Sequence, residues 1–364
     1  MTKTYLLVVL GLLVVSPVPI LRAAPPLFET DKPLSMVLEL PLMDLLRRAQ
    51  SKPTVAGSLR YTDSDGAVIE LKVEVTTRGK SRLEHCSLPP LSIYLKQPQV
   101  ESTIFAGQAK LKLVTQCRGR SVYRRYLMQE YAIYRTYNLL TKYSFQVRML
   151  QVTYRDSGGR SDKNMVQPAF FIESREAVAE RHAMRTIDAN RVYIRQLDPR
   201  QLSLLSLFQY LVGNTDWSAR KGPGTERCCH NGKVIAPVDS DEGWLVLPYD
   251  FDQSGIINTS YSAPSDLLSI KSVRQRLYRG FCASNTQLDS TIATFNERRV
   301  VIEELFGNAS DVSSANKSAR KYVQGFYKII NDPKKRKKKI VDACQGTKQH
   351  RKVSGNHSYR PKTH

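Results

Sequence analysis

Acidic residues are scarce in this chain of 364 residues, which has 33 Asp and Glu against 55 Lys and Arg and a formal net charge of +22. Such an excess attracts polyanions, among them nucleic acid, anionic lipid and acidic envelope polymers. No nucleic-acid recognition motif accompanies the dispersed charge, so a specific nucleic-acid partner is not expected, whereas anionic surfaces are candidate partners. The basic run at 334–339 is typical of a solvated face or a flexible tail.

Long apolar runs are also scarce, and the clearest one spans residues 5–15. It is too short to cross a bilayer comfortably, follows a basic start at Lys3 and precedes the small residues Ala23 and Ala24, so it predicts a cleaved signal peptide over residues 1–24. A retained N-terminal anchor is the alternative. In both cases the rest of the chain is expected outside the cytoplasm, periplasmic or secreted, without a further transmembrane segment.

Cysteines number only six, and an exported protein is expected to pair them in disulfides. The sequence leaves their connectivity open. The adjacent Cys228 and Cys229 are each expected to reach a distant partner, because the small ring between neighbours strains the backbone. Zinc binding by these two cysteines and His230 is a weaker alternative, since consecutive ligands lack the usual two-residue spacer.

The first half of the chain has the pattern of a sheet with one long helix. Short alternating segments bounded by turn residues predict strands, and apolar residues spaced by three, four and seven predict an amphipathic helix. The expected strands lie at 57–61, 67–75, 91–95, 110–114, 146–154 and 167–173, and the helix lies at 123–142.

The second half is predicted to be mainly helical, with helices at 199–212, 290–306 and 318–330. The two halves together predict an α+β arrangement of two lobes. A cleft between lobes is the default position of a binding or active site. The predicted organisation is a sheet-and-helix lobe at 25–175, a helical lobe at 176–345 and a basic disordered tail at 346–364.

Acidic and amide side chains in the second half follow apolar segments. Asp216 comes after the predicted helix at 199–212, and Asp250 comes after the apolar segment 245–248, with Asn231 between them. Carboxylates at the ends of buried elements supply the hard oxygen ligands that hold Mg²⁺ beside a phosphate. In phosphoryl transfer one Asp orients the attacking hydroxyl, and a later Asn and Asp hold the metal, which is the order found here.

These residues resemble the signature of the CotH-like atypical secreted kinases, which are related in fold to protein kinases and HipA-type kinases. The resemblance rests on Gly213-Asn214-x-Asp216-Trp217, then Asn231, then Pro248-Tyr249-Asp250-Phe251-Asp252, with similar landmarks at Arg78-Gly79, Lys110–Leu113 and Phe171-Ile172-Glu173. It covers residues 60 to 260 and implies a two-lobed protein-kinase-like fold, with a mainly antiparallel-sheet N-lobe containing one long helix and a mainly helical C-lobe.

The resemblance also implies roles for individual residues and cofactors. Asp216 would be the catalytic-loop Asp. Asn231 and Asp250 would bind Mg or Mn, with Asp252 as a further ligand, and ATP or another nucleotide would be the phosphoryl donor.

The resemblance also implies an ion pair between Lys112 and Glu130 that positions the phosphates of the nucleotide. Lys110 is an alternative to Lys112, because alternation along the strand puts both on one face. Arg78, in Arg78-Gly79-Lys80, would approach phosphate with its guanidinium, or this tripeptide is an ordinary turn.

The chain departs from the protein-kinase pattern in three ways. It has no Gly-x-Gly-x-x-Gly loop, its Asp216 and Asn231 lie 15 residues apart, and Asp-Phe-Asp replaces Asp-Phe-Gly. Each candidate also has a structural interpretation: Asp216 can close an Asx turn, Asp250 and Asp252 can pair with arginines, and His230 can be a structural histidine.

The sequence is compatible with three functions. The leading prediction is an exported CotH-like kinase that transfers a phosphoryl group from a metal-bound nucleotide to a hydroxyl of an unidentified protein or envelope acceptor. The main alternative is a non-catalytic kinase-like scaffold that binds an anionic envelope polymer or a partner protein. The third is a metal-dependent phosphoester hydrolase that uses the same carboxylates.

Overall fold

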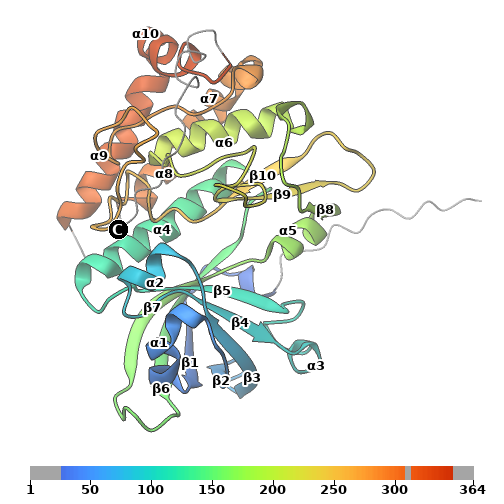
Figure 1. The fold of residues 1–364 in the computed structure, drawn as a ribbon, viewed down its shortest axis with the longest axis vertical. Helices are drawn as coiled ribbons and strands as arrows, with labels where there is room; N and C mark the ends of the chain where they lie inside the picture. Colours follow the sequence, from blue (N-terminus) through green and yellow to red (C-terminus); the bar gives the residue numbers. More distant parts are fainter. Residues whose placement is uncertain (1–25, 308–312, 347–364) are drawn as a thin grey trace, which may run out of the picture.

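The structure is a computed structural model that describes residues 26–307 and 313–346 (Figure 1). The predicted signal peptide at 1–24 and all of the predicted tail except Gly346 lie outside the described residues. A barrel of strands occupies one end of the molecule and a group of helices the other, with the long helix α4 (Ser121–Leu140) between them (Figure 1).

The N-terminal part forms a closed barrel of seven strands in the order β1-β2-β3-β4-β5-β7-β6. Neighbouring strands are antiparallel except for β1 and β6, whose parallel pairing closes the barrel, with Leu34 opposite Leu150. Alternate side chains point inward, as in β1, where Leu34, Met36, Leu38 and Leu40 are buried. The strands are β1 (Leu34–Leu40), β2 (Thr54–Thr62), β3 (Val68–Thr77), β4 (Leu91–Leu95), β5 (Lys110–Thr115), β6 (Val147–Asp156) and β7 (Met165–Ile172).

The expected two-lobed protein-kinase-like fold with a mainly antiparallel-sheet N-lobe is wrong. The first seven strands close into a mixed barrel with one parallel pair, and a second sheet of three strands lies in the part expected to be mainly helical. The physical reason is that alternation along a strand shows which face is buried but not which distant strand completes the hydrogen bonds.

Turn and capping residues explain why the local predictions held. The predicted strands at 57–61 and 67–75 are confirmed as β2 and β3, which form an antiparallel hairpin. Asp63 holds the turn between them, since its Oδ1 accepts hydrogen bonds from the backbone of Asp65 and Ala67 at 3.0 and 2.8 Å. The predicted helix at 199–212 is α6 (Pro199–Val212), where Asp198 caps the N-terminus by accepting from Gln201 N at 2.8 Å.

Helices and a small sheet make up the rest of the chain. The predicted helix at 290–306 is interrupted at Arg298, which separates α7 from α8. The strands β8 (Met184–Ile187), β9 (Gly232–Pro237) and β10 (Leu245–Pro248) form an antiparallel sheet in the order β10-β9-β8. The remaining helices are α1 (Leu42–Arg47), α2 (Ser81–His85), α3 (Gln97–Val100), α5 (Arg175–Arg181), α7 (Leu288–Glu297), α8 (Arg299–Leu305), α9 (Ser313–Ile330) and α10 (Pro333–Arg336), with short 3₁₀ or π turns at Pro26–Phe28, Ala49–Ser51, Ile194–Gln196, Cys282–Gln287 and Lys337–Val341.

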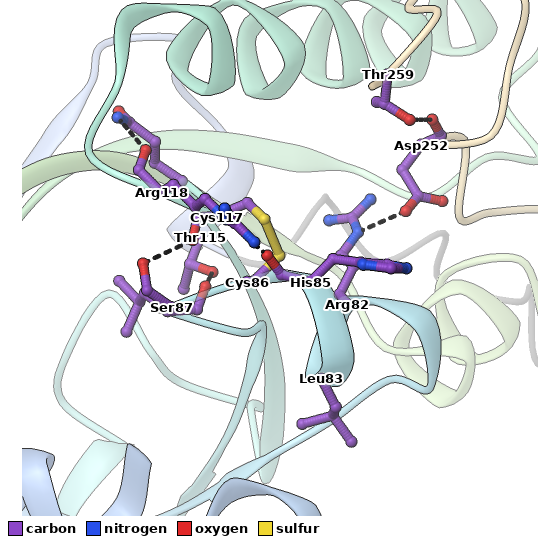
Figure 2. Close-up of a disulfide and its surroundings, with 12 residues drawn as sticks. Arg82, Leu83, His85, Cys86, Ser87, Thr115, Cys117, Arg118, Asp252 and Thr259 are labelled. Carbon is purple, nitrogen blue, oxygen red and sulfur yellow. Dashed lines mark hydrogen bonds and ion pairs between the residues drawn. A yellow bond between two sulfur atoms is a disulfide. The ribbon is translucent and has the colours of Figure 1, made fainter. Parts of the chain in front are cut away.

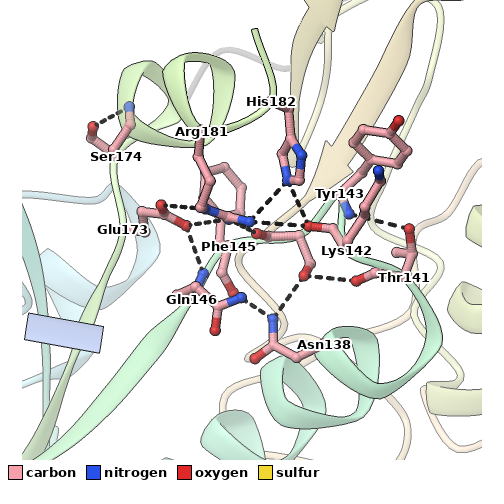
Figure 3. Close-up of polar contacts among 12 residues, drawn as sticks. Asn138, Thr141, Lys142, Tyr143, Phe145, Gln146, Glu173, Ser174, Arg181 and His182 are labelled. Atoms are coloured by element: carbon pink, nitrogen blue, oxygen red, sulfur yellow. Dashed lines mark hydrogen bonds and ion pairs between the residues drawn. The ribbon is translucent and has the colours of Figure 1, made fainter. Parts of the chain in front are cut away.

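A buried ion pair joins the barrel to the C-terminal part. Glu173, directly after β7, is fully buried and receives two hydrogen bonds from Arg181 of α5, at 3.2 and 2.8 Å (Figure 3). The backbone N–H of Gln146 donates to the same carboxylate at 2.9 Å. Desolvation raises the pKa of Glu173, and the Arg181 guanidinium opposes this rise. The contacts fix the chain direction where it leaves the barrel.

All six cysteines are paired, as expected for an exported chain, in Cys86–Cys117, Cys228–Cys229 and Cys282–Cys344. The expectation of distant partners for Cys228 and Cys229 is wrong, because these neighbours bond to each other. Disulfide sulfurs are not thiolate ligands, so the zinc alternative at this position is wrong as well. Within residues 26–307 and 313–346, none of the helices combines the length and apolarity that a bilayer crossing requires.

Candidate functional site

A cavity of about 610 Å³ lies between the barrel and the C-terminal part. Its walls come from segments far apart in the chain: the loop between β3 and α2, the middle of α4, and the loops that follow α6 and β10. Six of the seven predicted site residues line it, namely Arg78, Glu130, Asp216, Asn231, Asp250 and Asp252, and Lys112 does not.

The end of α6 sets the position of Asp216. Gly213 terminates the helix in the left-handed conformation, with φ of 66°, and a Cβ at this position would lie 2.0 Å from the Tyr322 hydroxyl. The buried Asn214 then accepts a hydrogen bond from the backbone of Asp216 at 2.9 Å, which closes an Asx turn. Because the Asn214 side chain closes this turn, the carboxylate of Asp216 is left to face the cavity.

Both carboxylate oxygens of Asp216 are held by neighbouring side chains. His230 Nε2 lies 2.6 Å from Oδ1, and Asn231 donates through Nδ2 to Oδ2 at 2.9 Å and to the backbone oxygen at 2.7 Å. The hydrogen bond to Asp216 raises the pKa of His230. The Asp216 side chain keeps 44 % exposure, so it remains accessible from the cavity.

The register of β9 and β10 brings Asn231 next to Asp250. Gly232 pairs with Pro248, and the backbone N–H of Tyr249 donates to Asn231 O at 3.2 Å. Asn231 and Asp250 both have left-handed backbones, with φ of 48° and 63°. Such conformations are uncommon outside glycine and cluster at functional sites.

Asp250 faces the cavity with its carboxylate partly open. Its backbone N–H donates to the Tyr134 hydroxyl at 3.0 Å, and its side chain keeps 40 % exposure. Desolvation by the surrounding protein, together with repulsion from Asp252, raises the pKa of Asp250, whereas Arg82 and Arg78 lower it. Asp250 is therefore the carboxylate of this set with most freedom to bind a ligand in the cavity.

A buried arginine, Arg82, holds the acidic side chains together. Its Nε lies 2.9 Å from Asp252, and its Nη2 lies 2.6 Å from Glu130 and 3.7 Å from Asp250. Figure 2 shows Arg82 reaching from α2 to Asp252, beside the disulfide that joins Cys86 to Cys117. Burial raises the pKa of Glu130 to about 7, and the adjacent guanidinium opposes this rise.

The predicted partner of Glu130 was Lys112, but Glu130 pairs with Arg82 instead. The sequence contained a signal for Arg82, since it lies four residues after Arg78 in the basic segment Arg78-Gly79-Lys80-Ser81-Arg82. The predicted cation was instead a lysine of β5, as the resemblance implies.

Lys112 lies near aromatic rings rather than carboxylates. Its ammonium group is 4.8 Å from the ring centroid of Tyr249 and 5.5 Å from that of Phe145. Burial, followed by repulsion from Arg78 and Lys233, lowers the pKa of Lys112 to about 7. The alternative lysine, Lys110, is exposed and lies over Tyr94, 4.8 Å from its ring centroid.

Three cations gather beside Tyr249 without a carboxylate partner. Lys233 lies 5.4 Å from the same ring centroid as Lys112, and Arg78 lines the cavity nearby. In the described part of the chain, none of the three forms an ion pair. Unpaired cations that are partly withdrawn from water cost free energy, which an anionic ligand would recover. Arg78 and Tyr249 line the cavity and the two lysines lie over the Tyr249 ring, so this wall is called the cationic side and the wall with the carboxylates the acidic side.

The acidic side fits a divalent cation that arrives with a phosphate. Among residues 26–307 and 313–346, no group of three or more His, Cys, Asp or Glu is arranged as an all-protein metal centre. Mg²⁺ usually takes one or two carboxylates and completes its shell with water and substrate phosphates. Asp250 has an open carboxylate for this purpose, while Asp252 is engaged by Arg82 and Asn231 by Asp216.

Comparison with known proteins adds no family assignment. No protein-family model matches the chain, and the search of curated proteins gives no match. The resemblance to CotH-like kinases therefore stays a prediction that rests on the motifs quoted above.

Proposed function

We propose that the chain is an exported phosphotransferase that moves a phosphoryl group from a metal-bound nucleotide to a hydroxyl of a protein or envelope acceptor. The observation that carries the proposal is that one cavity of about 610 Å³ has the carboxylates of Asp216 and Asp250 on one wall and Arg78 on another. Lys112 and Lys233 do not line the cavity, but both lie over the ring of Tyr249, which does. The resemblance to CotH-like kinases supports the proposal only through the chemistry of these residues, because the fold differs from the one that the resemblance implies.

Asp216 is the proposed proton acceptor. Each of its carboxylate oxygens receives one hydrogen bond, from His230 or from Asn231, and retains a lone pair for the hydroxyl of an acceptor. As that hydroxyl oxygen bonds to the terminal phosphorus, its proton passes to Asp216 and the bond to the bridging oxygen breaks, which releases the nucleoside diphosphate. His230 and Asn231 keep the carboxylate oriented during this step.

The cationic side is the proposed position of the phosphates. Arg78 offers a planar fork of donors, and Lys112 and Lys233 supply positive charge near Tyr249. Asp250, whose carboxylate is open to the cavity, would hold Mg²⁺ or Mn²⁺, while Asp252 and Asn231 stay engaged by Arg82 and Asp216. A bound cation would neutralise phosphate charge and orient the terminal phosphate.

A second candidate function is binding of an anionic ligand without reaction. The observation in its favour is the same group of unpaired cations, Arg78, Lys112 and Lys233, which suits any phosphate-bearing or carboxylate-bearing partner. A scaffold of this kind would need neither metal nor an accessible proton acceptor. The two functions separate by their dependence on Asp250 and Asp216.

The deciding experiment measures the melting temperature of the full chain with ATP, with Mg²⁺ or Mn²⁺, and with both. Ligand at 100 times its dissociation constant stabilises by about 2.7 kcal/mol, which is a rise of roughly 5 °C for a protein of this size. We expect this rise only with metal and ATP together, and its loss in Asp250→Asn. Asp241→Asn is the matched control, because Asp241 is exposed and pairs with Arg185 away from the cavity.

Radiolabelled ATP then tests transfer. We expect phosphate incorporation into added protein or envelope fractions, lost in Asp216→Asn while nucleotide binding persists. Stabilisation by polyanions that is independent of metal and Asp250 would instead establish the scaffold. Stabilisation by metal and phosphate without preference for a base, with phosphoester cleavage, would establish the hydrolase.

A further inference from the structure

A second, smaller cavity of about 240 Å³ lies on another side of α4. Its walls are formed by Arg125 and Gln129 of α4, by the loop that contains Asn258, by Arg274, and by Ser318 of α9. None of these residues lines the larger cavity, and no Asp or Glu in the described part of the chain lines this one. Its polar lining therefore has two positive charges and no negative one.

The guanidinium groups of Arg125 and Arg274 lie over aromatic rings and not beside carboxylates. The guanidinium carbon of Arg125 lies 5.6 Å from the ring centroid of Tyr126, and that of Arg274 lies 5.0 Å from that of Tyr322. Neither arginine has an ion pair within residues 26–307 and 313–346. Contact with a ring face leaves the in-plane N–H groups of a guanidinium free to donate.

The neighbouring Arg276 differs from these two arginines because its guanidinium has hydrogen-bond acceptors within the protein. Its guanidinium donates to the backbone oxygens of Tyr210, Leu211 and Tyr322, at 3.0, 3.1 and 2.6 Å. Carbonyl oxygens carry no net charge, so these contacts satisfy the N–H groups of Arg276 without adding a negative charge to the cavity. Arg125 and Arg274 lack even such backbone acceptors for their guanidinium groups among the described residues.

A buried amide in the same cavity is also incompletely satisfied. Gln129 keeps only 6 % exposure, and its side-chain carbonyl oxygen has no hydrogen-bond partner. Gln129 and Arg125 are four residues apart on α4, so both side chains lie on one face of the helix. Buried polar side chains are normally hydrogen-bonded, and an unpaired one indicates a missing partner.

We propose that this cavity binds a tetrahedral oxyanion of the phosphate class, as inorganic phosphate or as the phosphate end of a small phosphorylated molecule. Two guanidinium forks supply charge-assisted hydrogen bonds to its oxygens. Gln129, Asn258 and Ser318 supply neutral donors around it. A P–OH group can in addition donate to an amide carbonyl oxygen, which sulfate at neutral pH cannot do. The site is independent of the function proposed for the larger cavity.

The first test uses the unaltered full chain and the arginine reagent phenylglyoxal, with modified residues located by peptide mass mapping. Phosphate is expected to protect Arg125 and Arg274 with one common half-saturation concentration, whereas chloride at equal ionic strength protects neither. Arg191, which lies over Tyr193 outside both cavities, should react equally under all conditions. Protection of Arg78 would report the larger cavity separately.

The second test is calorimetric titration with phosphate of Arg125→Gln, Arg274→Gln and the control Arg191→Gln. Loss of one charge-assisted hydrogen bond, about 1.5–3 kcal/mol, corresponds to an affinity decrease of roughly 10-fold or more in the first two variants and none in the third. Glycerol phosphate in place of phosphate distinguishes a phosphomonoester site from one that admits only the free ion, and sulfate measures the contribution of the P–OH group.

Several results would overturn the proposal: no protection of either arginine, equal protection by chloride, or unchanged phosphate affinity in both arginine variants. Asp250→Asn should leave this site intact, so its phosphate binding is measured even if the larger cavity proves inactive. Far-UV circular dichroism in phosphate-free buffer checks the folding of each variant, and the protection experiment does not depend on any of them.

Discussion

Replacing Arg82 with Met tests whether a buried guanidinium is what allows acidic side chains to gather in the larger cavity. The side chains of Glu130 and Asp252 keep 5 % and 9 % exposure, and Arg82 contacts them at 2.6 and 2.9 Å. Removing one partner of a buried ion pair leaves an uncompensated charge and costs about 3–5 kcal/mol. We expect Arg82→Met to lower the free energy of unfolding by about that amount at pH 9.

The effect should depend on pH because Glu130 titrates near neutrality. Burial raises its pKa to about 7 in the presence of Arg82, and loss of the guanidinium raises it further. A carboxyl with a higher pKa in the folded than in the unfolded protein binds more protons when folded. Its contribution to stability therefore falls as the pH rises from the unfolded pKa, about 4.3, to the folded pKa. In Arg82→Met this fall continues above pH 7, so the difference from the wild type grows there.

Urea unfolding at pH 5, 7 and 9, followed by circular dichroism, measures this difference. The matched control is Arg60→Met, because Arg60 contacts Glu39 at 2.7 Å but both side chains keep about a third of their exposure, 31 % and 36 %. A pair so exposed contributes about 1 kcal/mol or less. The reasoning is refuted if Arg82→Met costs no more than the control at pH 9, or if its cost does not increase between pH 5 and 9.

Three further predictions concern single residues. Burial lowers the pKa of Lys112 from 10.5 to about 7, so its charge destabilises the folded state fully below pH 7 and progressively less up to pH 10.5. Lys112→Met should therefore raise the free energy of unfolding by up to about 5 kcal/mol at pH 6 and by less at pH 10. Urea unfolding at the two pH values measures the difference. The raised pKa of His230 contributes stability that is present below about pH 6.5 and is lost as the pH rises through the folded pKa. His230→Gln should therefore lower the free energy of unfolding by about 1 kcal/mol or less at pH 6, because the pair is partly exposed, and by less at pH 9, as measured by thermal denaturation at the two pH values. Gly213→Ala should lower the free energy of unfolding by about 3 kcal/mol or more, since its Cβ would lie 2.0 Å from the Tyr322 hydroxyl. The control Gly66→Ala has a similarly positive φ but nothing within 4 Å of the added Cβ, so it should lower this free energy by only about 1 kcal/mol. Thermal denaturation measures both variants.

Local sequence signals predicted individual elements well. The strand at 91–95 coincides with β4, and the helix at 199–212 coincides with α6. An alternating pattern, a capping Asp and a terminal Gly act within a few residues of the element they define, so one sequence contains enough information to locate them.

Long-range pairing was beyond those signals. The strand β1 was not singled out, and its parallel pairing with β6 closes the expected mainly antiparallel sheet into a mixed barrel. The sheet β8-β9-β10 was not predicted within the mainly helical second half for a similar reason, because short strands in a long loop-rich segment have little periodicity. Both cases depend on contacts between segments that no local pattern specifies.

The candidate site shows the same division. The sequence by itself determined which groups are available: Asp216, Asn231 and Asp250 in order, with the two acidic residues each after an apolar segment, and cysteines sufficient for three disulfides. The tertiary structure alone decided that Glu130 pairs with Arg82 and that Lys112 lies over Tyr249. Residue types and their spacing along the chain indicate which chemical groups a protein can use. Ion-pair partners and cavity walls depend instead on how distant segments pack, because packing determines which charged groups are buried and which opposite charges lie next to them.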